Sequence, residues 1–491
     1  MTSITQSLFK RLTIPHILII SMVVHFLAGL NSTGFHHFDE HFQIIEFLNV
    51  KTNPKVLPDL AWEYEAMIRP WFQVYLYYLI MKFLGLFNIN DHVLLVDIFR
   101  ITTAMFGFYC FYRFQNSMKH FFKSDMAFKL MVFFLHLTWF IPYIQARHSS
   151  ESLGLDFFVL GLSFYFDINT KNKNRDKFLA GLLMATAYLC RSQIAVMVAT
   201  FWFWSIYNDR KIDLKFILFS LGIATAILVG PIFDYWGYGK WTFVPYNYYF
   251  QNIVKGVLEN NGVSPWYFYI KEIFTKSIPS LGLIVLLVFT LFSVLNPKHF
   301  ITAIILPFFF FHMALGHKEL RFLFPLAPFF AVALALFIDQ FKYDLHYWYE
   351  NKKWLKIFLN FSFGLNLFLL IAVCFRPTNA SHLFYGYVWN HPEIKEIIAV
   401  EKDPYEFIDL KMNFFKPDYL KLNIFPYYND SAVDKITGEK FILFQNTRDG
   451  LYFKEKRKCE TMYSTYPDWV VNFDIGHWVG RTRAWMLLKC R

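Results

Sequence analysis

Long apolar runs constrain the fold of this chain more than any other feature of its sequence. A transmembrane helix needs roughly 20 mostly apolar residues, and about a dozen runs approach that length between residues 14 and 375. Of the 491 residues, 56% are hydrophobic and only 17% are charged, with a mean hydropathy of +0.31, whereas soluble domains carry about 25% charged residues. The sequence therefore predicts an α-helical polytopic membrane protein.

Basic residues beside the apolar runs predict its orientation. Lys10 and Arg11 precede the first run, 14–30, and cytoplasmic loops are enriched in Lys and Arg. The other loops expected in the cytoplasm are 113–127, 171–177 and 210–215. About eleven crossings result if either 71–87 lies in the membrane plane or 178–207 crosses only once. Most of the net charge of +11 lies in residues 1–375, where the basic loops are, and it does not indicate a nucleic-acid partner.

The chain changes character after residue 375. Residues 376–491 are polar and mix short apolar segments with turn-forming residues. We expect a membrane domain over 1–375, with an extracytoplasmic catalytic loop at 31–70, followed by a small extracytoplasmic α/β domain. Two tail cysteines, Cys459 and Cys490, could form a disulfide in an oxidising compartment or remain two free thiols.

Two adjacent acids follow the first apolar run. Asp39 and Glu40 come directly after His37 and Phe38. The apolar spacing over 38–48 predicts an amphipathic helix at the membrane interface, with Asp39 and Gln43 on one face. Because a carboxylate facing hydrocarbon is costly, we expect Asp39 in water at the bilayer edge. There it could serve as a general base, although an ordinary solvated loop is the alternative.

Charged residues also stand at the ends of later apolar runs. They are Arg147, His148, Glu151, Arg191, Asp234, His317, Lys318, Glu319 and Arg321. Any one of them could simply extend to water. Several cations on the extracytoplasmic side, however, run against the preference for positive loops inside and favour an anionic ligand such as a phosphate. A lipid-phosphate sugar donor fits, because its phosphate must be stabilised as it leaves and its acceptor hydroxyl needs a base.

The motifs together resemble those of glycosyltransferase family 22. Residues 37–43, His-Phe-Asp-Glu-His-Phe-Gln, are similar to the family's His-Pro-Asp-Glu-x-x-Gln, with Phe38 in place of Pro. Residues 317–325 are similar to its His-Lys-Glu-x-Arg-Phe-x-x-Pro. Further similar positions are Asp234, Tyr238, Gly239, Trp241, Asn247, Pro265 and Trp266. One segment departs: where the family carries an Asn and a final Glu, this chain has Glu151 and Gly154, which bears on acceptor specificity.

The resemblance, most like the GPI mannosyltransferase III branch, implies the GT-C superfold with about 11 transmembrane helices. It implies an inverting transfer of mannose from a polyprenol (dolichol-type) phosphate-mannose to a lipid-linked glycan such as a GPI precursor, without a metal or other cofactor. Asp39 is the implied general base, assisted by Glu40. The implied donor-phosphate residues are Arg147, Arg191, His317, Lys318 and Arg321. The implied sugar or acceptor residues are His37, Gln43, Glu63, Arg69, Asp234 and Glu319.

Two other functions remain open at this stage. One is a different GT-C sugar transferase of bacterial envelope glycan assembly, which would place the site at the periplasmic face of an inner membrane rather than in the endoplasmic reticulum. The other is a transporter or flippase for lipid-linked oligosaccharides. A transporter predicts matching Gly/Pro-broken helices in two halves, and Pro231, Pro307 and Pro325 have no counterparts in the first half.

Overall fold

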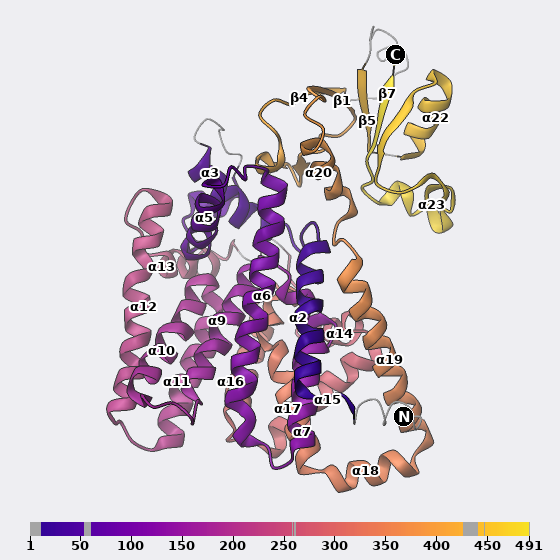
Figure 1. The fold of residues 1–491 in the computed structure, drawn as a ribbon. Coiled ribbons are helices and arrows are strands. Elements are labelled where there is room, and N and C mark those ends of the chain that lie inside the picture. Colours follow the sequence, from indigo (N-terminus) through magenta and orange to yellow (C-terminus); the bar gives the residue numbers. More distant parts are fainter. Residues whose placement is uncertain are drawn as a thin grey trace. The chain divides into compact units, whose positions relative to one another are not determined.

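The computed structural model of this protein describes residues 11–53, 60–257, 259, 262–425, 440–445 and 447–490. The chain forms two compact units (Figure 1). Unit 1 comprises Met1–Asn31, Glu63–Tyr77 and Phe99–Arg376, and unit 2 comprises Ser32–Trp62, Tyr78–Ile98 and Pro377–Arg491. The chain therefore passes between the units several times. The boundary expected at residue 375 stays a prediction.

Unit 1 is built from helices. Within the part of unit 1 that the structure describes, the α-helices are α2 (Ile14–Asn31), α7 (Asp125–Leu137), α8 (Phe140–Gln145), α9 (Ser150–Tyr165), α10 (Lys173–Cys190), α11 (Ala195–Asp209), α12 (Leu214–Tyr238), α13 (Val244–Tyr249), α14 (Phe268–Lys276), α15 (Pro279–Leu295), α16 (Phe300–Ala314), α17 (Ala327–Gln340), α18 (Lys342–Asn351) and α19 (Lys353–Phe375). The helices α4 (Trp62–Glu65), α5 (Phe72–Gly85) and α6 (His92–Met118) begin in one unit and end in the other.

The length and composition of the helices confirm a polytopic membrane protein. Among the described residues, five segments are long and apolar enough to cross a membrane, and the shorter helices α15 and α16 are also apolar. The five are Ile14–Asn31, His92–Phe121, Leu214–Tyr238, Leu320–Gln340 and Lys353–Trp389. The expected total of eleven crossings stays a prediction.

Small residues let three helices of unit 1 approach closely. A Cβ on Gly181 of α10 would lie 1.9 Å from the carbonyl oxygen of Phe219, and one on Gly222 of α12 would lie 2.1 Å from that of Phe178. A Cβ on Gly230 of α12 would contact the Leu189 side chain near the end of α10, so α10 and α12 are parallel neighbours. On the other side of α10, Gly161 of α9 lies against the Ala180 carbonyl. Glycines at such crossings allow backbone contact between membrane helices.

The segment 178–207 forms two helices, α10 and α11. Trp202 of α11 donates from Nε1 to Ser220 Oγ at 2.9 Å, so it is level with the part of α12 that contacts Gly181. Tyr188 and Ala195, in contrast, stand on either side of the turn between the two helices. The two helices are therefore antiparallel, which favours the alternative in which 178–207 crosses twice and 71–87 is not a crossing.

A chain of buried polar side chains links five helices of unit 1. His136 of α7 lies 2.8 Å from Gln115 of α6 and 3.1 Å from Ser21 of α2. His25 Nε2 lies 2.6 Å from Gln145 Oε1 of α8. The Gln145 amide donates to Asp156 Oδ1 of α9 at 3.1 Å. Buried polar groups need such partners, so the contacts fix how these helices are rotated against one another.

Unit 2 contains a five-stranded sheet with strand order β4-β1-β5-β7-β6. Its strands are β1 (Glu396–Val400), β4 (Lys421–Phe425), β5 (Lys440–Phe444), β6 (Glu460–Ser464) and β7 (Met486–Cys490), and β2 (Glu406–Phe407) pairs with β3 (Leu410–Lys411). The strand β1 runs parallel to β4 and β5, whereas β7 is antiparallel to β5 and β6. The sheet and the helix α22 (Thr447–Arg457) share an apolar core. The predicted α/β domain is confirmed.

The two tail cysteines are bonded to each other. Cys459 precedes β6 and Cys490 ends β7, and a disulfide joins them across 31 residues. Of the two states left open by the sequence, the structure has the bonded one. Cys110, Cys190 and Cys374 are buried thiols.

Unit 2 also includes early parts of the chain. The π-helical turn His41–Ile45 continues into α3 (Glu46–Thr52), and both meet the later segment 377–415. The Asn379 side chain accepts from the Phe35 amide at 2.7 Å, and Glu46 Oε1 accepts from the Phe414 amide at 2.9 Å. Among the described residues, unit 2 also contains the α-helices α20 (Leu383–Trp389) and α23 (Asp468–Asn472).

Candidate active site

Two arginines of unit 1 share one carboxylate. Arg191 Nη2 lies 3.1 Å from Glu151 Oε1, and Arg321 Nη1 lies 3.4 Å from the same oxygen. All three side chains are no more than 5% exposed. Both guanidinium groups also lie near the Phe322 ring, at 5.2 and 5.4 Å from its centre. Three parts of the chain far apart in sequence thus meet at one buried ionic site.

A second carboxylate extends this ionic site. Glu319 accepts from Arg321 Nε at 2.5 Å and lies 2.8 Å from His317 Nε2. We call Arg191, Arg321, Glu151 and Glu319 the arginine–glutamate cluster. A guanidinium donates hydrogen bonds in a fixed planar fork that matches carboxylates and other oxyanions.

Local sequence explains why Glu151 lies in this position. Ser149 caps α9 by accepting from the Ser152 amide at 3.2 Å, and Ser152 Oγ donates back to the Ile144 carbonyl at 2.7 Å. These bonds shape the turn between α8 and α9 and place Glu151 in the first turn of α9. A carboxylate is stabilised there by the partial positive charge at the helix N-terminus.

Arg191 lies at the break between two apolar helices. It is the extended residue between α10 and the turn that begins α11. Its Nε donates to Gln193 Oε1 at 3.1 Å, and its Nη1 donates to Ser150 Oγ at 3.4 Å. The charge of Arg69 also acts on it, so a third guanidinium lies within electrostatic range.

The other predicted phosphate residues have different surroundings. Lys318 donates to the carbonyl oxygens of Ser264 at 2.9 Å and Gly316 at 3.4 Å, and also to that of Leu315. Arg147 is fully buried, with its guanidinium 5.4 Å from the centre of the Tyr143 ring. Lys318 thus braces the loop before Arg321.

The predicted sugar residues of unit 1 hold the segment 63–71. Asp234 Oδ1 accepts from the Trp71 amide at 3.0 Å, and Tyr238 donates its hydroxyl to the Arg69 carbonyl at 2.9 Å. Arg69 in turn lies 3.4 Å from Glu63. A Cβ on Gly237 would overlap the Trp71 ring at 1.9 Å, so only glycine fits beneath it. In these contacts Asp234 holds Trp71, and Tyr238 holds Arg69.

The predicted base belongs to unit 2. Asp39 Oδ1 lies 3.4 Å from His37 Nδ1, and Glu40 Oε1 accepts from the His36 amide at 3.0 Å. Gln43 follows in the π-helical turn. Glu40 therefore organises the loop that presents Asp39.

Two expectations about this segment are wrong in detail. Asp39 is only 8% exposed and Glu40 only 3%, whereas we expected Asp39 in open water. The predicted helix forms, but the π-helical turn widens it between Asp39 and Gln43, so the two do not keep the four-residue spacing of one α-helical face. Residues 39–49 are all buried rather than half exposed at an interface.

One charged residue of the cluster was missing from the predicted site. Glu151 contacts both Arg191 and Arg321, yet sequence comparison treats it only as a departure from the family motif. The signal that could have revealed it is an acid in the first turn of an apolar helix, four residues after Arg147. Over the described part of the chain, no group of three His, Cys, Asp or Glu residues could hold a metal ion.

Comparison with known proteins places these residues in a family. Residues 16–405 match the family model described as the Alg9-like mannosyltransferase family. The chain is 26% identical to "GPI alpha-1,2-mannosyltransferase 3" of Bos taurus over 64% of this chain and 55% of that protein. It is 24% identical to "GPI mannosyltransferase 3" of Debaryomyces hansenii over 80% of this chain and 70% of that protein. The chain thus spans about half the length of its vertebrate relatives.

Solved structures show the same fold. ArnT from Cupriavidus metallidurans, solved in the apo state and bound to undecaprenyl phosphate, aligns with TM-scores of 0.53 and 0.52. Each alignment covers 96% of this chain and 97% of ArnT at 9% identity. The predicted GT-C membrane fold is confirmed. With a family model matched over most of its length, the chain belongs to the Alg9-like mannosyltransferase family.

Proposed function

We propose that this protein is an inverting mannosyltransferase that moves mannose from a polyprenyl-phosphate (dolichol-type) donor to a lipid-linked glycan such as a GPI precursor. Membership of the mannosyltransferase family supports the reaction class. The names of the relatives, among them GPI mannosyltransferases of animals and yeasts, support the acceptor class.

The observation that carries the proposal is the arginine–glutamate cluster. Two buried guanidiniums gathered at one site suit a phosphate that gains negative charge as it leaves. ArnT, which shares the fold, has been solved with undecaprenyl phosphate, and this agrees with a lipid-phosphate ligand for the fold. Lys318 would act by fixing the loop that carries Arg321.

In the proposed reaction Asp39 accepts the proton of the acceptor hydroxyl as that oxygen bonds to C1 of mannose. The bond from C1 to the phosphate oxygen breaks on the opposite face, so the configuration at C1 inverts. The phosphate departs with the bonding electron pair, and the guanidiniums of Arg191 and Arg321 stabilise it. One carboxylate suffices as base because no glycosyl-enzyme intermediate forms.

We expect this chemistry to need no metal. A chelator that abolished transfer in a way reversed by added divalent cation would contradict this part of the proposal. We also place the reacting groups on the extracytoplasmic side of the membrane, because the basic loops mark the other side. Protease protection of tagged loops in sealed vesicles tests that orientation.

Asp39→Asn tests the base. This change keeps the size of the side chain and removes its basicity, so transfer of labelled mannose to a glycolipid should fall about 10²- to 10⁴-fold with unchanged thermal stability. Asp167→Asn is the matched control, since Asp167 is a partly exposed acid that pairs with Arg113 next to a basic loop. Near-normal transfer by Asp39→Asn would remove the assignment.

The glycan that receives the sugar is tested separately. Mass spectrometry of the lipid-linked glycans that accumulate on deletion of the gene should show a GPI precursor lacking one mannose. Accumulation of an unmodified envelope glycolipid instead would favour the bacterial GT-C transferase.

A further inference from the structure

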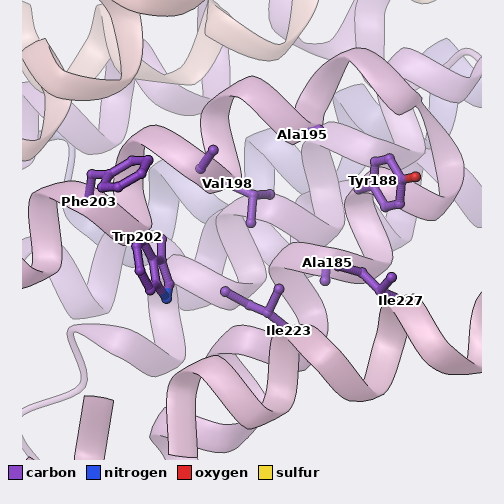
Figure 2. A pocket seen from close by; sticks show the side chains of 9 residues that line it. Ala185, Tyr188, Ala195, Val198, Trp202, Phe203, Ile223 and Ile227 are labelled. Atoms are coloured by element: carbon purple, nitrogen blue, oxygen red, sulfur yellow. The ribbon is translucent and has the colours of Figure 1, made fainter. Parts of the chain in front are cut away.

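Helices α10, α11 and α12 of unit 1 enclose an apolar cavity of about 320 Å³. Figure 2 shows the side chains that line it, among them Ala185, Tyr188, Trp202, Phe203 and Ile227. Phe203 is 64% exposed and Ile227 38% exposed, so the cavity opens on the outer surface of the helices. We call it the α10–α12 groove.

The groove is a consequence of uneven packing between the three helices. The helix α12 contacts α10 closely at Gly181 and Gly222, whereas α11 faces them with the small residues Ala195 and Ala199. The indole of Trp202 cannot easily turn into the space, because its Nε1 donates to Ser220 Oγ at 2.9 Å. The space is therefore built into the fold.

The lining suits a hydrocarbon. The polar side-chain atoms of the lining residues are the hydroxyl of Tyr188 and the indole nitrogen of Trp202. The indole nitrogen donates a hydrogen bond to Ser220. Pockets of roughly 300–1,000 Å³ hold small ligands, so the groove can take part of a long chain.

One residue of the arginine–glutamate cluster, Arg191, is close along the chain to lining residues of the groove. Arg191 lies on the turn between α10 and α11, three residues after Tyr188 and four before Ala195. From Ala195 to Phe203 the helix α11 rises about 12 Å. A lipid whose phosphate binds at Arg191 would thus find an apolar channel leading away from its head group.

We infer that the α10–α12 groove binds the isoprenoid chain of the polyprenyl-phosphate donor. This inference rests on the proposed function, because the donor phosphate at Arg191 is what brings the chain to this place. Ala195 and Ala199 lie one turn apart, about 6 Å along the helix, and leave successive recesses. Such recesses suit the regularly spaced methyl branches of an isoprenoid better than a straight acyl chain.

The test fills the groove and varies the length of the donor chain. Ala199 is exposed at the edge of the groove, so Ala199→Phe can occupy the space without disturbing the core. Ala224→Phe is the matched control: Ala224 is an exposed alanine of α12 outside the groove. KM is measured in reconstituted membranes with dolichyl-phosphate-mannose and with citronellyl-phosphate-mannose, whose short chain ends near Arg191.

We expect Ala199→Phe to raise KM for the dolichyl donor about tenfold through lost apolar burial, and to leave KM for the citronellyl donor unchanged. The Ala224→Phe control should leave both values unchanged. Equal changes for both donors, no change beyond the control, or a rise in KM for the acceptor alone would each overturn the inference.

Failure of the proposed function would be visible in the same experiment, because the wild-type protein would transfer no mannose from either donor. In that case, binding of dolichyl phosphate tests whether the groove holds the isoprenoid chain. Native mass spectrometry should show weaker retention of dolichyl phosphate by Ala199→Phe than by Ala224→Phe, with no such difference for citronellyl phosphate. Equal retention of dolichyl phosphate by the two variants would overturn the inference.

Discussion

At the scale of single residues, the pairing of Glu151 with Arg191 and Arg321 differs from an ordinary surface salt bridge. All three side chains are buried. Removing one partner of a buried pair leaves a charge in a medium that solvates it poorly and costs about 3–5 kcal/mol. The carboxylate of Glu151 thus keeps two cations in place.

Glu151→Gln should therefore lower the thermal midpoint of the protein in detergent. We expect dolichyl phosphate to restore part of the lost stability, because its phosphate would replace the missing negative charge. The control is Glu350→Gln, since Glu350 forms a partly exposed pair with Lys356 and such pairs contribute at most about 1 kcal/mol. Equal midpoints for the two variants would contradict the assigned role.

A second prediction concerns the pair of His317 and Glu319. The hydrogen bond to Glu319 raises the pKa of His317 above its ordinary value, against the opposing effects of burial and of Arg321. The pair therefore stabilises the folded state fully below about pH 6.5, and this contribution is lost as the pH rises through the raised value. Thermal midpoints measured across this range should show the loss in wild type and lack it in His317→Gln.

At the scale of elements, the buried polar chain sets the geometry of the turn that carries Glu151. Gln145 ends α8, and its amide joins His25 of α2 to Asp156 of α9. The apolar runs predict these helices well, because a membrane-spanning helix needs a long stretch of apolar residues. The rotation of each helix is not predictable in this way, since it depends on partners such as His25 and Gln145, which lie 120 residues apart.

Gly107→Ala tests this polar chain. A Cβ on Gly107 of α6 would lie 2.6 Å from Gln145 Nε2 and 3.0 Å from Asp156 Oδ1. The displaced amide would lose hydrogen bonds in a buried site, so we expect a destabilisation of about 1–3 kcal/mol in a reversible unfolding assay.

Gly364→Ala supplies the comparison for this measurement. Nothing lies within 4 Å of a Cβ built on Gly364 of α19, so alanine there should be neutral or stabilise the helix by up to about 1 kcal/mol. If both alanine variants behaved alike, the polar chain would have no special role.

At the scale of the whole molecule, the sequence predicted the membrane fold and the identity of the charged site residues. It predicted their burial and their contacts less well. Charges at the ends of apolar runs stand out, which is how Arg191 and Arg321 could be found. The burial of Asp39 could not be found in this way, because unit 2 is completed by residues such as Phe414, hundreds of positions later. Glu151 was not predicted as a site residue because no sequence spacing relates a single acid in this position to Arg191 or Arg321.

The disulfide supports a prediction about the tail. Cys459 and Cys490 close a loop of 31 residues, so their bond should stabilise unit 2 by about 3–4 kcal/mol through a smaller unfolded ensemble. Alkylation of native, unreduced protein should leave both unlabelled in mass spectrometry. The double variant with serine at 459 and 490 should be cleaved by protease in the tail sooner than wild type. Equal cleavage of both proteins would contradict this stabilisation.

The contact of Glu46 with the Phe414 amide has a consequence for biosynthesis. Residues 32–53 leave the ribosome early, whereas the segment 377–415, which supplies their hydrogen-bond partners, is synthesised more than 300 residues later. Until then residues 32–53 lack these hydrogen-bond partners and stay accessible to chaperones and quality control near the translocation channel. A premature stop codon just after Arg376 should therefore yield a protein that inserts its helices normally and is still degraded.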